Sequence, residues 1–276
     1  MRIGFIDYYI DEWHANNYPR MIAEASEGQD TVIGVYALID QYMNRRTTDE
    51  WCSQMGIPHY DDIGSLVNNS DALIVLSPDN PEKHEELSRI PLISGKPVYI
   101  DKTFAPDGDT AKRIFELAEK YGTPCCSTSA LRYATEYTGI NPEKVQAVTT
   151  WGPQDYPRYS IHQLEPIMMF IKSRARRVMA NCCDGYTNIV IEFADGRCAS
   201  LTTILHGSPF MTNVVSAVGN QALTIKSDFF MEFIKHLIEF LHTGRTEITH
   251  DETIRIIETR SAGLKAIENP GIWIEV

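Results

Sequence analysis

Residues 71–84, DALIVLSPDNPEKH, and residues 95–105, GKPVYIDKTFA, decide the fold of this chain. Each stretch contains a short apolar run, ALIVLS at 72–77 and KPVYID at 96–101, of the kind that forms a buried strand. Prolines end the first run, and residues 82–90 between the two runs have a helical pattern. A strand, a helix and a second strand in succession predict one unit of a parallel sheet.

The same alternation extends to both sides of this stretch. Further apolar strands are predicted at 2–7, 31–38 and 124–130, and helices at 13–25 and 109–121. Apolar strands that alternate with helices are typical of a doubly wound parallel sheet with both faces covered. We therefore predict a Rossmann-like α/β domain over residues 1–128.

The pattern changes in the second half of the chain. A strand at 144–152 and a helix at 158–171 are followed by several strand candidates with no helix between them, and two helices close the chain. Asp195-Gly196 marks a hairpin turn, since this dipeptide accepts positive φ. Strands in direct succession predict a mostly antiparallel open sheet, so residues 129–276 are expected to form an α+β domain.

Composition places the chain among ordinary globular proteins. Its 276 residues are 43% hydrophobic and 22% charged, with a net charge of −12. An acidic surface repels phosphate backbones, which argues against nucleic acid as a partner. No apolar run reaches the about 18 residues that would predict a membrane span. The six cysteines form two adjacent pairs and two singles without a CxxC, which predicts reduced thiols in a cytoplasmic protein.

Chemistry is expected where the parallel strands end, because ligands of such sheets bind at the carboxyl ends of the strands. Lys102 directly follows the strand at 96–101 and could act as a general acid or bind a substrate hydroxyl, unless it is a plain exposed loop lysine. His162, near the start of the helix predicted at 158–171, is a second candidate for proton exchange; the alternative is a capping or core histidine. No HExxH occurs, so no metal site is predicted.

The segment from Asp71 to Tyr133 resembles the Gfo/Idh/MocA family of NAD(P)-dependent sugar and polyol oxidoreductases. The family pattern is DAVIVATPNxxH, then GKHVxxEKPLA, then a helix and a strand that leads into an NYRF-like turn. This chain has DALIVLSPDNPEKH, GKPVYIDKTFA, a helix at 109–121 and STSALRYA. In the second domain, IHQLEPIMMFI at 161–171 is similar to the family's GxHxxDxxxWL helix, which places His162 on the family histidine.

The resemblance implies hydride transfer between NAD or NADP and a carbohydrate-like substrate. Lys102 would exchange a proton with the reacting oxygen, and His162 would orient or relay that proton in the same cleft. The family's pairing through the open face of the second sheet also implies a homo-oligomer. The implied cofactor-binding residues are Asp7, Tyr8, Asp40, Ser77, Pro78, Asn80, His84 and Asp101, and the implied substrate-binding residues are Trp151, Arg158 and Tyr159.

Three features depart from the family pattern. The family's GxGxxG is replaced by Asp7-Tyr8-Tyr9-Ile10-Asp11-Glu12, whose bulk and negative charge oppose a dinucleotide diphosphate. Ala37 stands where an acidic residue would hold the adenosine ribose, although Asp40 lies a few residues later. The family's EKP reads Asp101-Lys102-Thr103, and Arg158 replaces the acid before the family histidine.

Three functions therefore stay open. The first is an NAD(P)-dependent oxidoreductase acting on a sugar- or polyol-like substrate. The second is a fold relative that no longer binds dinucleotide and acts as a small-ligand-binding protein or as a non-catalytic partner of another enzyme. The third is non-redox chemistry, such as lyase or hydrolase action, in the same cleft.

Overall fold

The computed structural model describes all 276 residues and divides into two compact units. The first unit comprises Met1–Thr128 and Phe233–His250, and the second comprises Ser129–Glu232 and Asp251–Val276. None of the helices is both long and apolar enough to cross a membrane.

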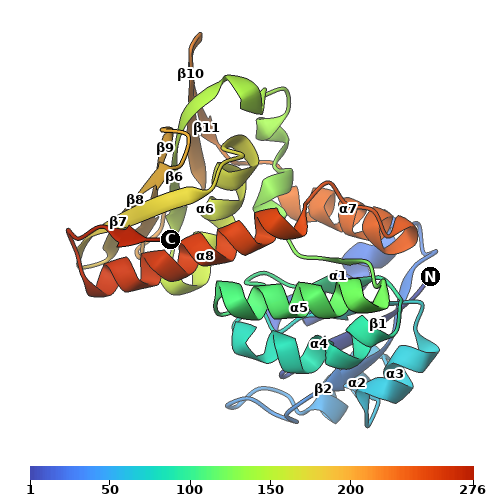
Figure 1. Ribbon diagram of the computed structural model, residues 1–276. Helices are drawn as coiled ribbons and strands as arrows, with labels where there is room; N and C mark the ends of the chain where they lie inside the picture. The colour runs from blue at the N-terminus through green and yellow to red at the C-terminus, as the bar shows by residue number, and fades with distance from the viewer. The chain divides into compact units, whose positions relative to one another are not determined.

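The first unit is built on a five-stranded parallel sheet (Figure 1). Its strand order is β2-β1-β3-β4-β5, as expected for a doubly wound fold, and the strands are almost completely buried at β1, β3 and β4. The strands are β1 (Arg2–Asp7), β2 (Thr31–Ala37), β3 (Ala72–Val75), β4 (Val98–Ile100) and β5 (Cys125–Cys126).

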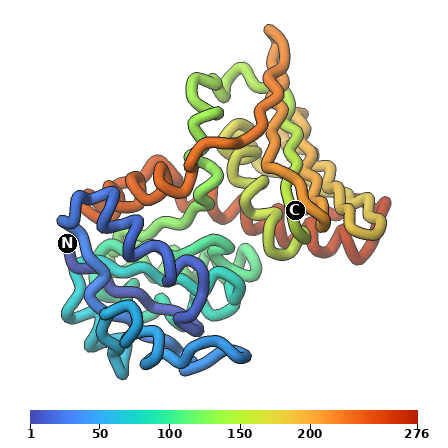
Figure 2. Tube along the Cα trace, turned by 180° about the vertical axis from the view of Figure 1, so that it is seen from behind, coloured from blue at the N-terminus to red at the C-terminus, as the bar shows by residue number.

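Helices cover both faces of this sheet. Figure 1 shows α4 and α5 side by side over one face, and Figure 2, from the opposite side, brings α1 to the front. Phe233 packs its ring near Tyr18 of α1 and Tyr99 of β4, which ties the returning segment of α7 to the first unit. The helices are α1 (Trp13–Ala25), α2 (Thr48–Met55), α3 (Ile63–Asn69), α4 (His84–Ile93), α5 (Gly108–Tyr121) and α7 (Phe229–Thr243), with a short 3-10 helix η1 (Pro81–Lys83).

Helix α5 shows how local sequence sets these elements. The Asp107 side chain accepts the Thr110 N–H at the start of the helix, and Gly122 ends it with φ +64° in the left-handed region. Ile114 and Phe115 are among the buried residues of its apolar face. The helix predicted at 109–121 is thus confirmed within one residue.

The second unit is built on a seven-stranded sheet in the order β11-β10-β6-β9-β8-β7-β12. Neighbouring strands are antiparallel except β6 and β9, which are parallel. The hairpin expected at Asp195-Gly196 joins β8 and β9. The strands are β6 (Val145–Pro153), β7 (Ala175–Cys183), β8 (Tyr186–Phe193), β9 (Cys198–Ile204), β10 (Met211–Ser216), β11 (Gly219–Thr224) and β12 (Ile274–Glu275).

Helices α6 (Tyr156–Phe170) and α8 (His250–Glu268) pack closely in this unit. A Cβ built at Gly263 would lie 1.9 Å from the Tyr156 hydroxyl, so only glycine permits this approach of α8 to α6. The Tyr156 hydroxyl donates a hydrogen bond to the Arg260 carbonyl, 3.3 Å away. Three short 3-10 helices precede β6, namely η2 (Ala130–Tyr133), η3 (Thr135–Tyr137) and η4 (Pro142–Lys144).

Two sequence expectations need correction here. The strand expected at 124–130 is reduced to Cys125–Cys126, because the chain leaves the sheet and the Ser127 hydroxyl bonds the Asp101 carbonyl instead. The helix expected at 158–171 begins at Tyr156 with Asp155 as its cap. His162 is therefore the seventh residue of α6 and does not feel the positive end of the helix as strongly as its expected place suggested.

Candidate functional site

The ends of β1, β3 and β4 bring together several of the predicted residues. Asp7 is the last residue of β1, and its Oδ1 accepts the N–H of Tyr8 at 2.7 Å and that of Ser77 at 3.0 Å. Asp101 directly follows β4, and Asp7, Ser77 and Asp101 are all buried. The carboxyl edge of the sheet is thus lined by two buried carboxyl groups.

Asp101 holds Lys102 at this edge. The Lys102 Nζ lies 3.6 Å from Asp101 Oδ2 and donates to the Pro78 carbonyl at 3.3 Å. The Tyr99 hydroxyl donates to Asp101 Oδ1 at 3.2 Å, while Asp101 Oδ2 accepts no hydrogen bond. The Lys102 side chain is only 12% exposed, so it is a positioned cation and not a free surface lysine.

His14 and Glu12 extend this cluster. His14 Nε2 lies 3.9 Å from Asp101 Oδ2, and His14 Nδ1 lies 2.8 Å from Glu12 Oε2. Both residues are buried. A chain of polar side chains therefore runs from Lys102 through Asp101 and His14 to Glu12 at the start of α1.

Burial changes the protonation of Asp7. Loss of hydration, together with the nearby charges of Glu12 and Asp101, raises the pKa of Asp7 well above its ordinary value. The hydrogen bonds from the N–H groups of Tyr8 and Ser77 act in the opposite direction but are outweighed. The Oδ2 atom of Asp7 has no hydrogen-bond partner, consistent with a carboxyl that favours its protonated form.

His84 has a structural role in this arrangement. Its Nε2 faces the carbonyls of Leu76 and Ser77 at 2.7 and 3.2 Å, and its Nδ1 faces the carbonyl of Phe104 at 3.0 Å. Burial lowers the pKa of His84, so the neutral ring is favoured. The His84 ring therefore lies between the end of β3 and the loop after β4, and in its neutral form it donates to the carbonyls on one side only.

The other residues of the predicted cofactor set lie closer to solvent. Tyr8 is partly exposed and carries the Lys83 Nζ 5.6 Å from its ring centre. Asn80 donates to Glu82 at 3.0 Å. Asp40 is exposed, and its Oδ1 accepts the Thr48 N–H at 3.0 Å, so it supports the start of α2.

Glu12 is the functional residue that the sequence did not single out for a role of its own. It is the N-cap of α1, where its two carboxylate oxygens accept the N–H groups of His14, at 2.7 Å, and of Ala15. It is 3% exposed. Glutamate is an uncommon N-cap, so the usual capping preferences gave no signal for this role.

In the second unit, His162 is held by Ser129. The Ser129 Oγ lies 2.7 Å from His162 Nδ1, and the ring of Tyr159 stands edge-on to the imidazole at 5.2 Å. Arg158 is 57% exposed and pairs with Asp155 at 2.6 Å, and Trp151 is half-buried on β6. His162 and Tyr159 are thus neighbours, whereas Arg158 is engaged at the helix cap.

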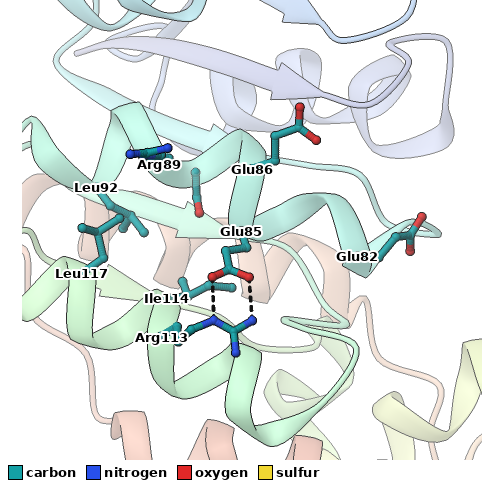
Figure 3. Close-up of a pocket in the computed structure, with 9 residues that line it drawn as sticks. Glu82, Glu85, Glu86, Arg89, Leu92, Arg113, Ile114 and Leu117 are labelled. Atoms are coloured by element: carbon teal, nitrogen blue, oxygen red, sulfur yellow. Dashed lines mark hydrogen bonds and ion pairs between the residues drawn. The ribbon is translucent and has the colours of Figure 1, made fainter.

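A separate cavity of about 560 Å³ lies between α4 and α5 (Figure 3). Arg113 forms a two-point ion pair with Glu85 there, at 2.8 Å for both bonds, and this pair lowers the pKa of the Glu85 carboxyl. None of the predicted site residues lines this cavity. It belongs to the helix layer and not to the strand ends.

Comparison with known proteins extends this description. The Gfo/Idh/MocA family, described as an oxidoreductase family with an NAD-binding Rossmann fold, matches residues 8–128. A comparison with curated proteins found no match to this sequence.

Solved structures match along the whole chain. GenD2 from gentamicin A biosynthesis, in complex with NAD, is 14% identical with a TM-score of 0.79, over 100% of this chain and 96% of its own. The myo-inositol 2-dehydrogenase of Lactobacillus plantarum is 13% identical with a TM-score of 0.74, over 100% and 99% of the two chains. The apo scyllo-inositol dehydrogenase of Lactobacillus casei is 13% identical with a TM-score of 0.75, over 99% and 97%. The predicted two-part α/β architecture is thereby confirmed.

The β1–α1 loop does not fit the diphosphate of a dinucleotide in the usual position. That position needs free N–H groups at the start of the helix and glycines that let the backbone approach. Here the N–H groups of His14 and Ala15 are bonded by Glu12, and Asp7 adds a second acidic side chain. The loop therefore supplies an anion of its own where the cofactor would supply one.

Proposed function

We propose that this chain, whose residues 8–128 match the Gfo/Idh/MocA oxidoreductase family, is an oxidoreductase of that type acting on a CH–OH group of a sugar- or polyol-like substrate. The observation that carries the proposal is the Lys102 ammonium, which Asp101 and the Pro78 carbonyl hold at the strand ends. The substrate class follows that of the similar structures, two of which are inositol dehydrogenases.

Lys102 would handle the proton of the reaction. As an ammonium it can donate a proton to a carbonyl oxygen, and as an amine it can accept one from a hydroxyl. The Asp101 carboxyl group, 3.6 Å away, fixes the place of the Lys102 Nζ. In the family, NAD(P) carries the hydride. The β1–α1 loop of this chain does not fit the diphosphate of that cofactor. We therefore assign only the proton transfer to the side chains of this protein.

A second candidate function is binding of the same class of small molecule without a dinucleotide and without turnover. Glu12 favours it, because its carboxylate bonds the helix N–H groups that a diphosphate would use. The protein would then be a ligand-binding protein or a non-catalytic partner of another enzyme.

Residues of the second unit are proposed for supporting roles. His162 would orient or relay the proton, supported by its hydrogen bond with Ser129 and by the match to the family histidine. Tyr159, Arg158 and Trp151 would contact the substrate.

We also propose that the protein is a homo-oligomer in the cytoplasm. One face of the second sheet carries side chains that are only half-buried within the chain, such as Asn188, Val190 and Glu192 on β8, whereas Ile189 and Ile191 on the other face are buried. A second copy would cover the half-buried face. Two adjacent cysteine pairs and two single cysteines, without a CxxC, support a reducing compartment.

The first test uses Lys102→Met with inositols and sugars as substrates and NAD⁺ or NADP⁺ as the oxidant. We expect the variant to lower kcat by about 100-fold or more, since general acid–base catalysis is typically worth that much. Nicotinamide absorbance reports turnover, and calorimetry reports polyol binding. Lys112→Met, on the outer helix α5, is the matched control and should behave as the wild type.

Three results separate the candidates. Turnover that Lys102→Met abolishes supports the oxidoreductase. Polyol binding without turnover supports the second candidate. Absence of polyol binding to the wild type contradicts both.

A further inference from the structure

The start of α1 is a helix N-terminus whose anion-binding groups are already used. The first N–H groups of a helix have no partner within the helix and attract anions, and dinucleotide-binding folds place a diphosphate there. In this chain Glu12 Oε2 accepts the His14 N–H at 2.7 Å and Glu12 Oε1 accepts the Ala15 N–H. The two oxygens of one carboxylate thus bind two neighbouring amides, as two phosphate oxygens would.

Glu12 is held firmly in this place. It is 3% exposed, and its Oε2 lies 2.8 Å from His14 Nδ1. The opposite nitrogen of the same ring lies 3.9 Å from Asp101 Oδ2. An incoming anion would have to displace a buried carboxylate and separate it from the imidazole.

The surroundings of Glu12 are unfavourable for a second anion. Asp7 and Asp101 are buried nearby, and the charges of Glu12 and Asp101 both act on Asp7. A diphosphate would add negative charge next to the carboxyl groups of Glu12 and Asp101 in a region of low dielectric, where repulsion between like charges is strong.

The loop's own side chains also occupy the region next to the end of β2, where an adenosine would lie. The Tyr9 ring stacks on Tyr42 with centres 4.5 Å apart and an angle of 14° between the planes. Arg46 bonds the Asp11 carboxylate at 2.6 Å, and Arg45 donates to the Asp11 carbonyl at 2.7 Å. Three residues of the segment after β2, Tyr42, Arg45 and Arg46, thus contact the β1–α1 loop.

We propose that Glu12 is a built-in anion that fills the phosphate position of α1, so that this protein does not bind a dinucleotide diphosphate there. The inference rests on the proposed small-molecule site at the strand ends. It narrows the oxidoreductase proposal, because any nicotinamide nucleotide would have to bind without the contacts to α1.

The test compares the wild type with Glu12→Gly and Glu12→Gln. NADH is titrated against each protein by nicotinamide fluorescence, and inorganic pyrophosphate by calorimetry. Glu12→Gly frees both N–H groups and removes the charge, whereas Glu12→Gln keeps the shape and removes only the charge. Glu24→Gln, an exposed glutamate of the same helix, is the control. Thermal melting verifies folding, and Glu12→Gln carries the test if the glycine variant does not fold.

The expected result is a wild-type Kd for NADH above about 1 mM and a gain in pyrophosphate affinity of about tenfold or more in a folded Glu12 variant. The control should not gain. A wild-type Kd below that value, or folded Glu12 variants that gain no pyrophosphate affinity, would overturn the inference. Polyol binding is measured separately, so failure of the proposed function would show there and not in the anion titrations.

Discussion

Asp7 is a carboxyl group whose environment opposes its charge, and this has a consequence for stability. Because the pKa of Asp7 is raised well above its ordinary value, the folded state keeps a proton that the unfolded chain loses at lower pH. Its contribution to the free energy of unfolding is therefore fully present below the unfolded pKa of about 3.9 and is lost as pH rises through the folded pKa.

Asp7→Asn tests this directly. The amide keeps an oxygen acceptor for the N–H groups of Tyr8 and Ser77 and cannot ionise. We expect the melting temperature of the variant, relative to wild type, to be higher at about pH 8 than at about pH 5. Each unit of pKa elevation contributes about 1.4 kcal/mol, or about 2–4 °C. An equal difference at both pH values would contradict the prediction, since any packing effect of the amide is independent of pH.

For individual residues, the sequence predicted the position in the sheet better than the side-chain contacts. Asp7, Ser77 and Asp101 were expected at one sheet edge because parallel strands end together, and the structure brings them there. The role of His84 as a backbone tie and the role of Glu12 as a cap depend on side-chain rotamers and on exact helix starts. Neither follows from residue type and spacing.

A buried ion-pair network joins three elements of the second unit. Arg132, on η2, donates to Glu165 of α6 at 2.8 Å and to Glu252 of α8. The Arg132 side chain is 11% exposed, and burial raises the pKa of Glu165 despite the nearby guanidinium. The arginine therefore balances two carboxyl groups that are both removed from water.

Arg132→Met should destabilise the second unit. The substitution leaves two buried carboxyl groups without their cation, which typically costs about 3–5 kcal/mol. Urea unfolding followed by circular dichroism measures the loss. Arg176→Met, at an exposed position of β7, should change stability by less than about 0.5 kcal/mol. A loss in Arg132→Met no larger than in this control would contradict the prediction.

Strongly periodic elements were predicted well, and weak ones were not. The helix at 13–25 is confirmed at both ends, although Pro19 lies inside it. Helix α3 was not predicted, because a stretch of seven residues with Gly64 and two asparagines has little periodic signal. The start of α6 was missed because Pro157 in its first turn resembles a loop, although proline is well tolerated there.

The topology of the whole molecule was predictable for one unit and not for the other. In the first unit, alternation of strands and helices dictates neighbouring parallel strands. In the second, β6 pairs with β9 and β10, and α6 carries the chain from β6 to β7 near the far edge of the sheet. Pairing between strands distant in sequence depends on tertiary packing that a single sequence does not reveal.

Sedimentation tests the proposed homo-oligomer. We expect the wild type to sediment as a dimer or larger assembly at micromolar concentration. Val190→Arg places a charge in the middle of the half-buried sheet face and should shift the equilibrium toward the monomer. Ile90→Arg, at an exposed position of α4, should leave assembly unchanged. A wild-type monomer, or equal behaviour of the two variants, would contradict the proposal.

Because Glu12 caps α1 from within the same chain, its effective concentration at the helix N–H groups determines how strongly an anion from solution can bind there. A ligand attached to the same backbone competes at a local concentration of at least about the millimolar range, whatever the composition of the solution. If Glu12 left the amides free for about 1% of the time, the apparent Kd of any competing phosphate would rise about 100-fold without a change in the amides themselves. The side chain of one cap residue can thus set the anion affinity of this helix N-terminus, and a single substitution can change that affinity.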